Sequence, residues 1–118
     1  MSVAAFGAGD AVSAVLGSAL DGLSARQSVI ANNIANVDTP GFRARSVEFE
    51  NSLRSAIDSQ GRTRASVQTS ATDTPVGAND NNVDLRKESM AAMQTQFQYQ
   101  LVTRAVADRF ELTKIAAS

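Results

Sequence analysis

The sequence contains no cysteine, histidine or tryptophan among its 118 residues. Without cysteine there is no disulfide bridge, thiolate metal site or cysteine nucleophile. Cysteine content therefore does not indicate whether the protein works in an oxidising or a reducing compartment. Without histidine the chain also lacks the commonest zinc ligand and the usual general base near neutral pH. The carboxylates Glu48 and Glu50 have polar neighbours. Such neighbours would not raise the pKa of one carboxyl above that of the other, as acid–base catalysis by a carboxylate pair requires. We therefore expect no enzyme activity, no cofactor and no metal site.

Motifs for other kinds of ligand are present only as fragments. Gly7-Ala8-Gly9 lacks the third glycine and the preceding strand of a phosphate-binding loop. Asp80 and Asp84 lack the ligand ladder and closing glutamate of a calcium loop. The net charge is −1, and the arginines between positions 43 and 64 are interrupted by acidic residues. We expect no small-molecule substrate and no nucleic-acid partner.

Long apolar runs and aromatic residues are also scarce. Aromatic residues make up 5% of the chain against 43% hydrophobic residues, many of them alanine. No run approaches the roughly 20 apolar residues that span a bilayer. The first residues lack the basic region and apolar core of a secretory signal, so we expect any export to proceed without a cleaved signal peptide. So small an apolar core predicts a marginally stable monomer.

The apolar spacing predicts one mostly α domain over residues 1–118, with long N- and C-terminal helices pairing as a coiled coil around an irregular, partly mobile middle segment. Leucine, isoleucine and valine recur at heptad-like spacing from Leu16 to Val37, interrupted at Gln27. Asp10 and Asp84 are predicted N-caps of the two helices. The expected segments are a flexible arm at 1–9, a helix at 10–37, a turn with a short extended or helical piece at 38–57, a mobile polar loop at 58–82, and a helix at 84–116.

A stretch of unusual composition ends the first helix. Proline and the turn before it stop a helix, and glycine follows where turns often need a positive φ. Three asparagines precede the turn, although asparagine is a poor residue for a helix interior. A plain helix end with a proline stop is the alternative interpretation. The candidate assembly residues in this stretch are Asn32, Asn33, Ile34, Asn36, Thr39, Pro40, Gly41 and Phe42.

The C-terminal helix has two apolar stripes on opposite sides, at about 100° per residue. One contains Met90, Met93, Phe97, Leu101, Ala105, Leu112 and Ile115, and the other contains Tyr99, Val102, Val106 and Phe110. The N-terminal helix can cover only one stripe, so the other is expected to contact another subunit. The alternative is that the central segment folds back over it. We take the second stripe as the intersubunit surface, so that a charge at Val106 or Phe110 should block assembly but not export.

The stretch from Ala31 to Phe42 resembles the N-terminal signature of the bacterial flagellar rod, hook and hook-associated axial proteins, A-x-N-I-A-N-x-x-T-P-G-[FY]. Phe42-Arg43-Ala44-Arg45 and Asn82-Val83-Asp84-Leu85 also resemble segments of short rod members of that family. The likeness covers about two-thirds of the chain and is silent over roughly 58–80. Lys87 departs from it, because an acidic residue is expected there.

The resemblance implies a structural subunit of the proximal rod, in the flagellar basal body and the periplasm. It implies self-association in a helical assembly, and contacts with other rod subunits, basal-body ring and adaptor proteins, and the flagellar export apparatus. A related second proximal rod protein is an alternative within the family. Outside the family, the alternative is a soluble helical adaptor or export chaperone that binds a partner helix.

Overall fold

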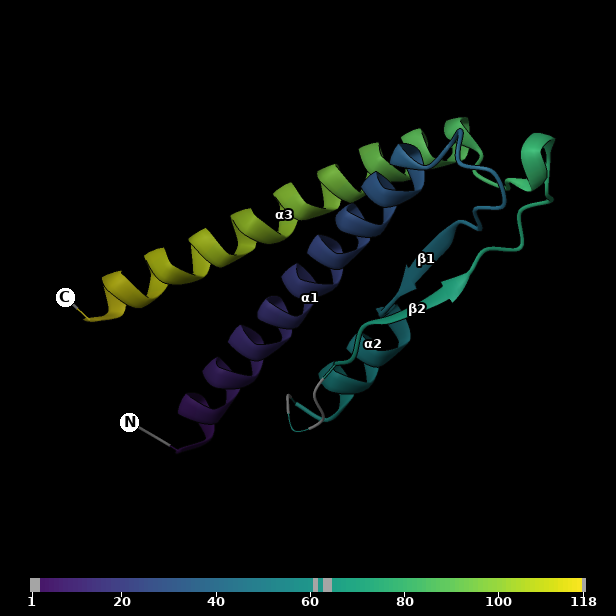
Figure 1. Cartoon of the computed structure of the whole chain (residues 1–118). Coiled ribbons are helices and arrows are strands. Elements are labelled where there is room, and N and C mark those ends of the chain that lie inside the picture. Colours follow the sequence, from purple (N-terminus) through teal and green to yellow (C-terminus); the bar gives the residue numbers. More distant parts are fainter. Residues whose placement is uncertain (1–2, 61, 63–64, 118) are drawn as a thin grey trace.

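The computed structural model describes residues 3–60, 62 and 65–117. Two 33-residue helices, α1 (Val3–Ala35) and α3 (Leu85–Ala117), dominate the chain. They are antiparallel, so both termini lie at one end of a molecule that measures 62 × 25 × 14 Å (Figure 1). The expected mostly helical fold, with long terminal helices packed together around an irregular middle, is confirmed. No helix in the described part of the chain is long and apolar enough to cross a membrane.

The two long helices begin differently with respect to the predicted caps. α3 begins after Asp84, whose carboxylate accepts a hydrogen bond from the amide of Lys87 at 3.1 Å, and this N-cap is confirmed. The flexible arm predicted at 1–9 is wrong for residues 3–9, which are helical. Asp10 therefore lies inside α1 and does not cap it. The alanines near this end favour helix strongly enough to outweigh the neighbouring glycines.

The middle segment is partly ordered. It contains β1 (Arg45–Glu48), α2 (Glu50–Asp58), β2 (Gln68–Ala71) and a short 3-10 turn, η1 (Ala78–Asp80). The two strands pair antiparallel, with Arg45 opposite Ala71 and Glu48 opposite Gln68. Over the described residues of 58–82, the expectation of an unbroken loop is therefore wrong at β2, and its predicted mobility stays a prediction.

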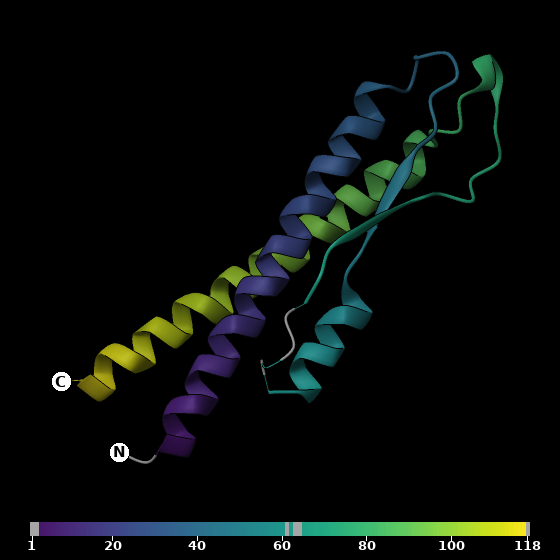
Figure 2. The ribbon, with the colours of Figure 1, turned by 60° about the horizontal axis from the view of Figure 1, so that its bottom comes forward.

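Helix α1 is the centre of the arrangement. It contacts α3 along one side, and β1 and α2 along another. The two long helices are inclined to each other, and the strand pair lies beside α1 (Figure 2). Leu23, Val47 and Phe49 form the buried cluster between α1 and the strands, with half-buried Leu53 and Val102 packed against it.

Candidate assembly interface

The buried asparagine of the signature, Asn33, joins α1 to the start of β1. Its side chain is 1% exposed, and its Nδ2 donates to the Arg45 carbonyl at 2.7 Å. Its Oδ1 accepts from the Arg45 amide at 3.1 Å. The donor and the acceptor of the Asn33 side chain are thus both used inside the subunit. They bond the Arg45 backbone as the backbone of a neighbouring strand would. The interpretation of Asn33 as a polar contact between subunits is therefore wrong.

Other polar residues of the signature shape the turn after α1. Asn36 Nδ2 donates to the Asn32 carbonyl at 2.7 Å, and Thr39 Oγ1 donates to Asn36 Oδ1 at 3.0 Å. Gly41 has a φ of 76°, so the predicted positive φ is confirmed. Pro40 is exposed, and Phe42 is half-buried immediately after the turn.

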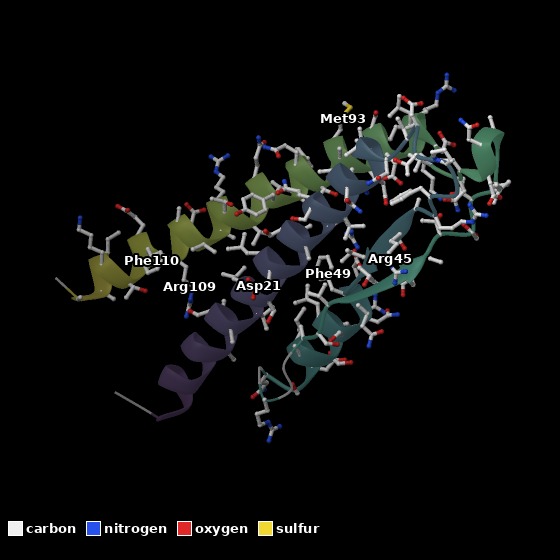
Figure 3. All side chains as sticks on the ribbon, in the orientation of Figure 1. Asp21, Arg45, Phe49, Met93, Arg109 and Phe110 are labelled. Carbon is white, nitrogen blue, oxygen red and sulfur yellow. The ribbon has the colours of Figure 1, made fainter. Side chains whose placement is uncertain are left out.

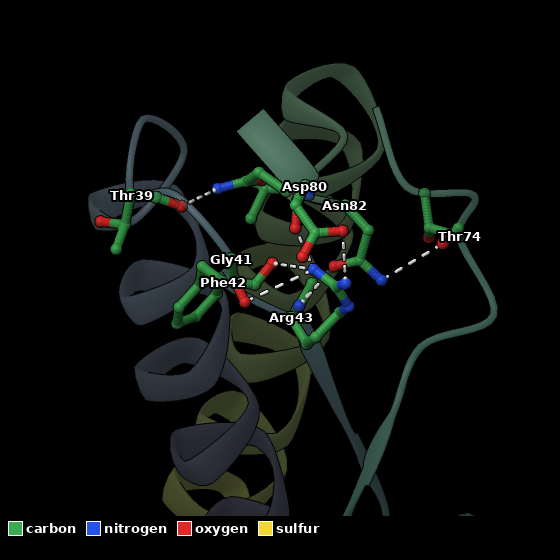
Figure 4. Close-up of polar contacts among 10 residues, drawn as sticks. Thr39, Gly41, Phe42, Arg43, Thr74, Asp80 and Asn82 are labelled. Carbon is green, nitrogen blue, oxygen red and sulfur yellow. Dashed lines mark hydrogen bonds and ion pairs between the residues drawn. The ribbon is translucent and has the colours of Figure 1, made fainter. Parts of the chain in front are cut away.

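The segment before α3 holds this turn in place. Asn81, which is buried, donates from Nδ2 to the carbonyls of Asn36 and Thr39, each at 2.8 Å. Buried Asn82 accepts from the Ala44 amide at 2.6 Å and donates to the Thr74 carbonyl at 3.2 Å. Figure 4 shows the contact that reaches the Thr39 carbonyl and the contact between Asn82 and Thr74. The asparagines before α3 and those of the signature therefore form one closed polar network.

An ion pair completes that network at the surface. The guanidinium of Arg43 lies 2.8 Å from Asp80 Oδ1 and also donates to the Asp80 carbonyl. The amide of Gly41 donates to the Asn79 carbonyl at 2.8 Å. Asn79 and Asp80 both have positive φ, which places their backbone groups against the turn. The sequence pattern singled out Asp80 only as part of an incomplete calcium loop and did not predict this pairing.

A second cluster lies where α1 meets β1 and α2. Arg26 donates to the Val47 carbonyl at 2.7 Å, pairs with Glu50 at 2.5 Å, and lies 4.8 Å from the centroid of the Phe49 ring. Burial acts to raise the pKa of the Glu50 carboxyl, but hydrogen bonds from Arg26 and from backbone amides outweigh it and lower that pKa below 4.5. The ring of Phe49 also packs against Gly22, where an added Cβ would lie 2.5 Å from ring atoms. Arg26 and Gly22 were not predicted as key residues.

Helix α3 packs on α1 with the second of its two stripes. Tyr99, Val102 and Val106 are half-buried, and towards the start of the helix Thr95 is 1% exposed. The Thr95 hydroxyl donates to the Ala91 carbonyl at 2.7 Å, so no polar group is left unsatisfied there. The interpretation of the second stripe as the outward surface is therefore wrong at these three apolar positions. Phe110, its last member, is 72% exposed.

The first stripe faces outward. Met93 is 74% exposed and points away from α1 (Figure 3), and Phe97 is 62% exposed. We call this surface the α3 ridge, and its large apolar members are Met90, Met93, Phe97, Leu101, Leu112 and Ile115, all more than half exposed. The ridge runs along a helix of roughly 50 Å.

Ile34 is half-buried and Asn32 is exposed, so the signature contributes little apolar surface of its own to an assembly. The structure brings the turn of the signature against the segment before α3, but it does not bring the signature together with the α3 ridge. In the described ranges, no group of three or more acidic residues is placed to hold a metal ion.

Two long antiparallel helices, joined to a turn that carries the signature of the axial proteins of the bacterial flagellum, give the class of protein that this signature predicted: a rod-type axial protein. The family model described as flagella basal body rod protein matches residues 14–43. The chain is 31% identical to the flagellar basal body rod protein FlgB of Borreliella burgdorferi, across 81% of this chain and 87% of the relative. It is 34% identical to FlgB of Bacillus subtilis, across 84% of this chain and 87% of the relative. It is 30% identical to FlgB of Escherichia coli, across 73% of this chain and 78% of the relative.

The chain therefore belongs to the FlgB family of flagellar basal body rod proteins, and it is a structural subunit of the proximal rod. These three relatives are all named FlgB, so the related proximal rod protein FlgC is not favoured. The adaptor or export chaperone is likewise not favoured.

Proposed function

We propose that this subunit polymerises through its terminal helices to help form the axial tube of the rod, with the α3 ridge covered by neighbouring subunits. The observation that carries the proposal is the exposure of six large apolar side chains along one face of α3. Monomeric proteins rarely leave a contiguous apolar patch of this kind uncovered.

The magnitudes support a contact between subunits. Full burial of one large apolar side chain contributes about 1.5–3 kcal/mol. Six of them together can offset the roughly 4–15 kcal/mol that association costs in lost freedom. Because the ridge lies on the side of α3 away from α1, closing it within the same subunit would require separating the helix pair.

The family resemblance supports the finer parts of the proposal. The partners are other rod subunits, with basal-body ring and adaptor proteins at the ends of the rod. The subunit reaches a periplasmic position through the flagellar export apparatus, without a cleaved signal peptide, and has no catalytic role. A thin molecule with a small core suits this route, because little stability has to be lost before passage in an unfolded state.

The test compares a charge on the ridge with a charge on the packed face. We expect Phe97→Glu to fold with unchanged helix content and to be exported, but to abolish rod assembly and swimming in a strain that lacks its own copy of the subunit. Val106→Glu should instead destabilise the monomer, since Val106 is half-buried on the same face of α3 as Tyr99 and Val102, which pack against the core. Circular dichroism, export assays and motility in soft agar separate the two outcomes. Normal swimming with Phe97→Glu would overturn the proposal.

A further inference from the structure

A groove crosses the face of α1 between α3 and the strand pair. Its volume is about 410 Å³. Its floor is apolar and its rim carries charges of both signs. The residues that matter here are Val29 and Ile30 of α1, Val47 of β1, Ala71 of β2, and Glu88 and Ala91 of α3.

One carboxylate in this groove has no partner in the described part of the chain. Glu88 is 6% exposed, and no described side chain or backbone amide hydrogen-bonds to its carboxylate or forms an ion pair with it. Its oxygen atoms are not sealed off from solvent, because no buried side-chain oxygen without a hydrogen-bond partner occurs among the described residues. The carboxylate therefore faces the groove. A largely covered carboxylate that has no partner of its own can form a charge-assisted hydrogen bond with a cation brought into the groove.

The other charged residues that line the groove already have partners. Arg26 pairs with Glu50, and Lys87 lies 4.0 Å from Asp73. Arg45 donates to the Thr69 carbonyl at 3.2 Å, and Glu48 accepts from the Ser70 hydroxyl at 3.4 Å. Among the described charged residues that line the groove, Glu88 is thus the one whose charged group has no partner in the described part of the chain.

A matching cation lies on the α3 ridge. Arg104 is exposed, and no described residue pairs with it. It follows Phe97 and Leu101 by seven and three residues, so all three share one helix face. Glu88 precedes Arg104 by sixteen residues, which places it on the opposite side of α3 at about 100° per residue. Arg104 therefore cannot reach Glu88 of its own chain.

We propose that the groove of one subunit receives the α3 ridge of a second copy, with Arg104 of that copy paired to Glu88 and with Phe97 and Leu101 on the apolar floor. The inference rests on the proposed function and names the surface that receives the ridge. Ridge and groove are different surfaces of one chain, so the contact is heterologous. Repetition of such a contact without closure produces an open helical array, as a rod requires.

Disulfide cross-linking tests the contact directly, because the natural sequence has no cysteine. The variant carries Ala91→Cys in the groove and Leu101→Cys on the ridge. Within one chain these positions are roughly 15 Å apart along the helix, too far for a disulfide. We expect oxidation of assembled rods to give a ladder of dimers, trimers and larger species on a denaturing gel. The matched control, Ala91→Cys with Thr103→Cys, places the second cysteine on another exposed face of α3 and should give no ladder.

Charge exchange tests the ion pair. Arg104→Glu and Glu88→Lys should each abolish assembly, and the double variant should restore it. Glu88→Gln keeps the shape of the side chain, so this variant should fold normally but assemble less well. It therefore tests the ion pair even if Glu88→Lys does not fold. Arg54→Glu, on α2 away from the groove, should assemble normally.

The outcomes separate this inference from the proposed function. If Phe97→Glu blocks assembly while the cysteine pair gives no ladder and Arg104→Glu assembles normally, the groove contact is overturned and the proposed function stands. If Phe97→Glu itself assembles normally, the proposed function fails, and the groove contact fails with it.

Discussion

Gly22 shows how a single residue determines whether two elements can pack. It lies in α1, where a glycine weakens the helix by about 1 kcal/mol relative to alanine. The ring of Phe49 occupies the space that a Cβ would need. Gly17, earlier in the same helix, has no atom within 4 Å of the corresponding position apart from its chain neighbours and the nearby backbone of α1. Substitution by alanine should therefore affect stability differently at the two glycines.

We predict that Gly22→Ala lowers the free energy of unfolding by about 1–3 kcal/mol, the usual cost of overpacking. The gain in helix propensity recovers only part of that cost. Gly17→Ala should leave stability unchanged or raise it by up to about 1 kcal/mol. Urea denaturation followed by circular dichroism measures both. Equal effects of the two substitutions would contradict the close packing of Phe49 on α1.

Asn33 has an internal role that predicts a different kind of loss. Asn33→Ala would leave both the amide and the carbonyl of Arg45 without their partner at a partly buried site. We expect a loss of about 1–3 kcal/mol in unfolding free energy. Asn32→Ala is the matched control: Asn32 is exposed, and its side chain accepts only a 3.3 Å contact from Asn36. Its effect should stay within about 0.5 kcal/mol.

The result for Asn33 has a clear counter-outcome. If Asn33→Ala unfolds at the same urea concentration as the unsubstituted chain but fails to assemble, the asparagine acts between subunits and not within one. Local sequence predicted the conformation of Gly41 and the cap at Asp84, because both depend on neighbours a few residues away. It did not predict the partner of Asn33, because that contact depends on where β1 lies after the turn.

At the scale of the elements, α3 shows the limit of periodicity. The sequence contains both apolar stripes, and their spacing alone does not say which one meets α1. Ala91, Ala92 and Thr95 decide it: these small residues continue the second stripe towards the start of α3 and let α1 approach closely. The ridge carries bulkier methionine and phenylalanine side chains at the corresponding turns, and it stays outside.

The short strand β2 was missed for a related reason. Its sequence, Gln-Thr-Ser-Ala, has no apolar alternation that would distinguish it from a polar loop. It forms because β1 presents a backbone edge to it, with the other edge of β1 already bonded to Asn33 and Arg26 of α1. The groove and Glu88 escaped prediction in the same way, since three elements far apart in sequence are needed to form them.

At the scale of the whole molecule, the packing is uneven along its length. The buried apolar residues lie between Ala19 and Ala56, and the described residues from Phe110 to Ala117 are all exposed. Amide hydrogen exchange depends on local opening, which is cheapest where few apolar contacts hold a helix. We therefore predict strong protection for α1 from Ala19 to Asn33 and for α3 from Glu88 to Val106, with rapid exchange beyond Arg109 in the isolated subunit.

Assembly should change this pattern at the end of α3. When neighbouring subunits cover the ridge, Leu112 and Ile115 become buried, and the last turns of α3 should gain at least roughly tenfold in protection. Hydrogen exchange read by mass spectrometry, on the isolated subunit and on purified basal bodies, measures the change. Phe97→Glu, which should remain unassembled, supplies the matched control. Uniform protection of α3 in the isolated subunit would show that this helix is held in place without a partner on the ridge. Burial of the ridge would then not be the driving force of assembly.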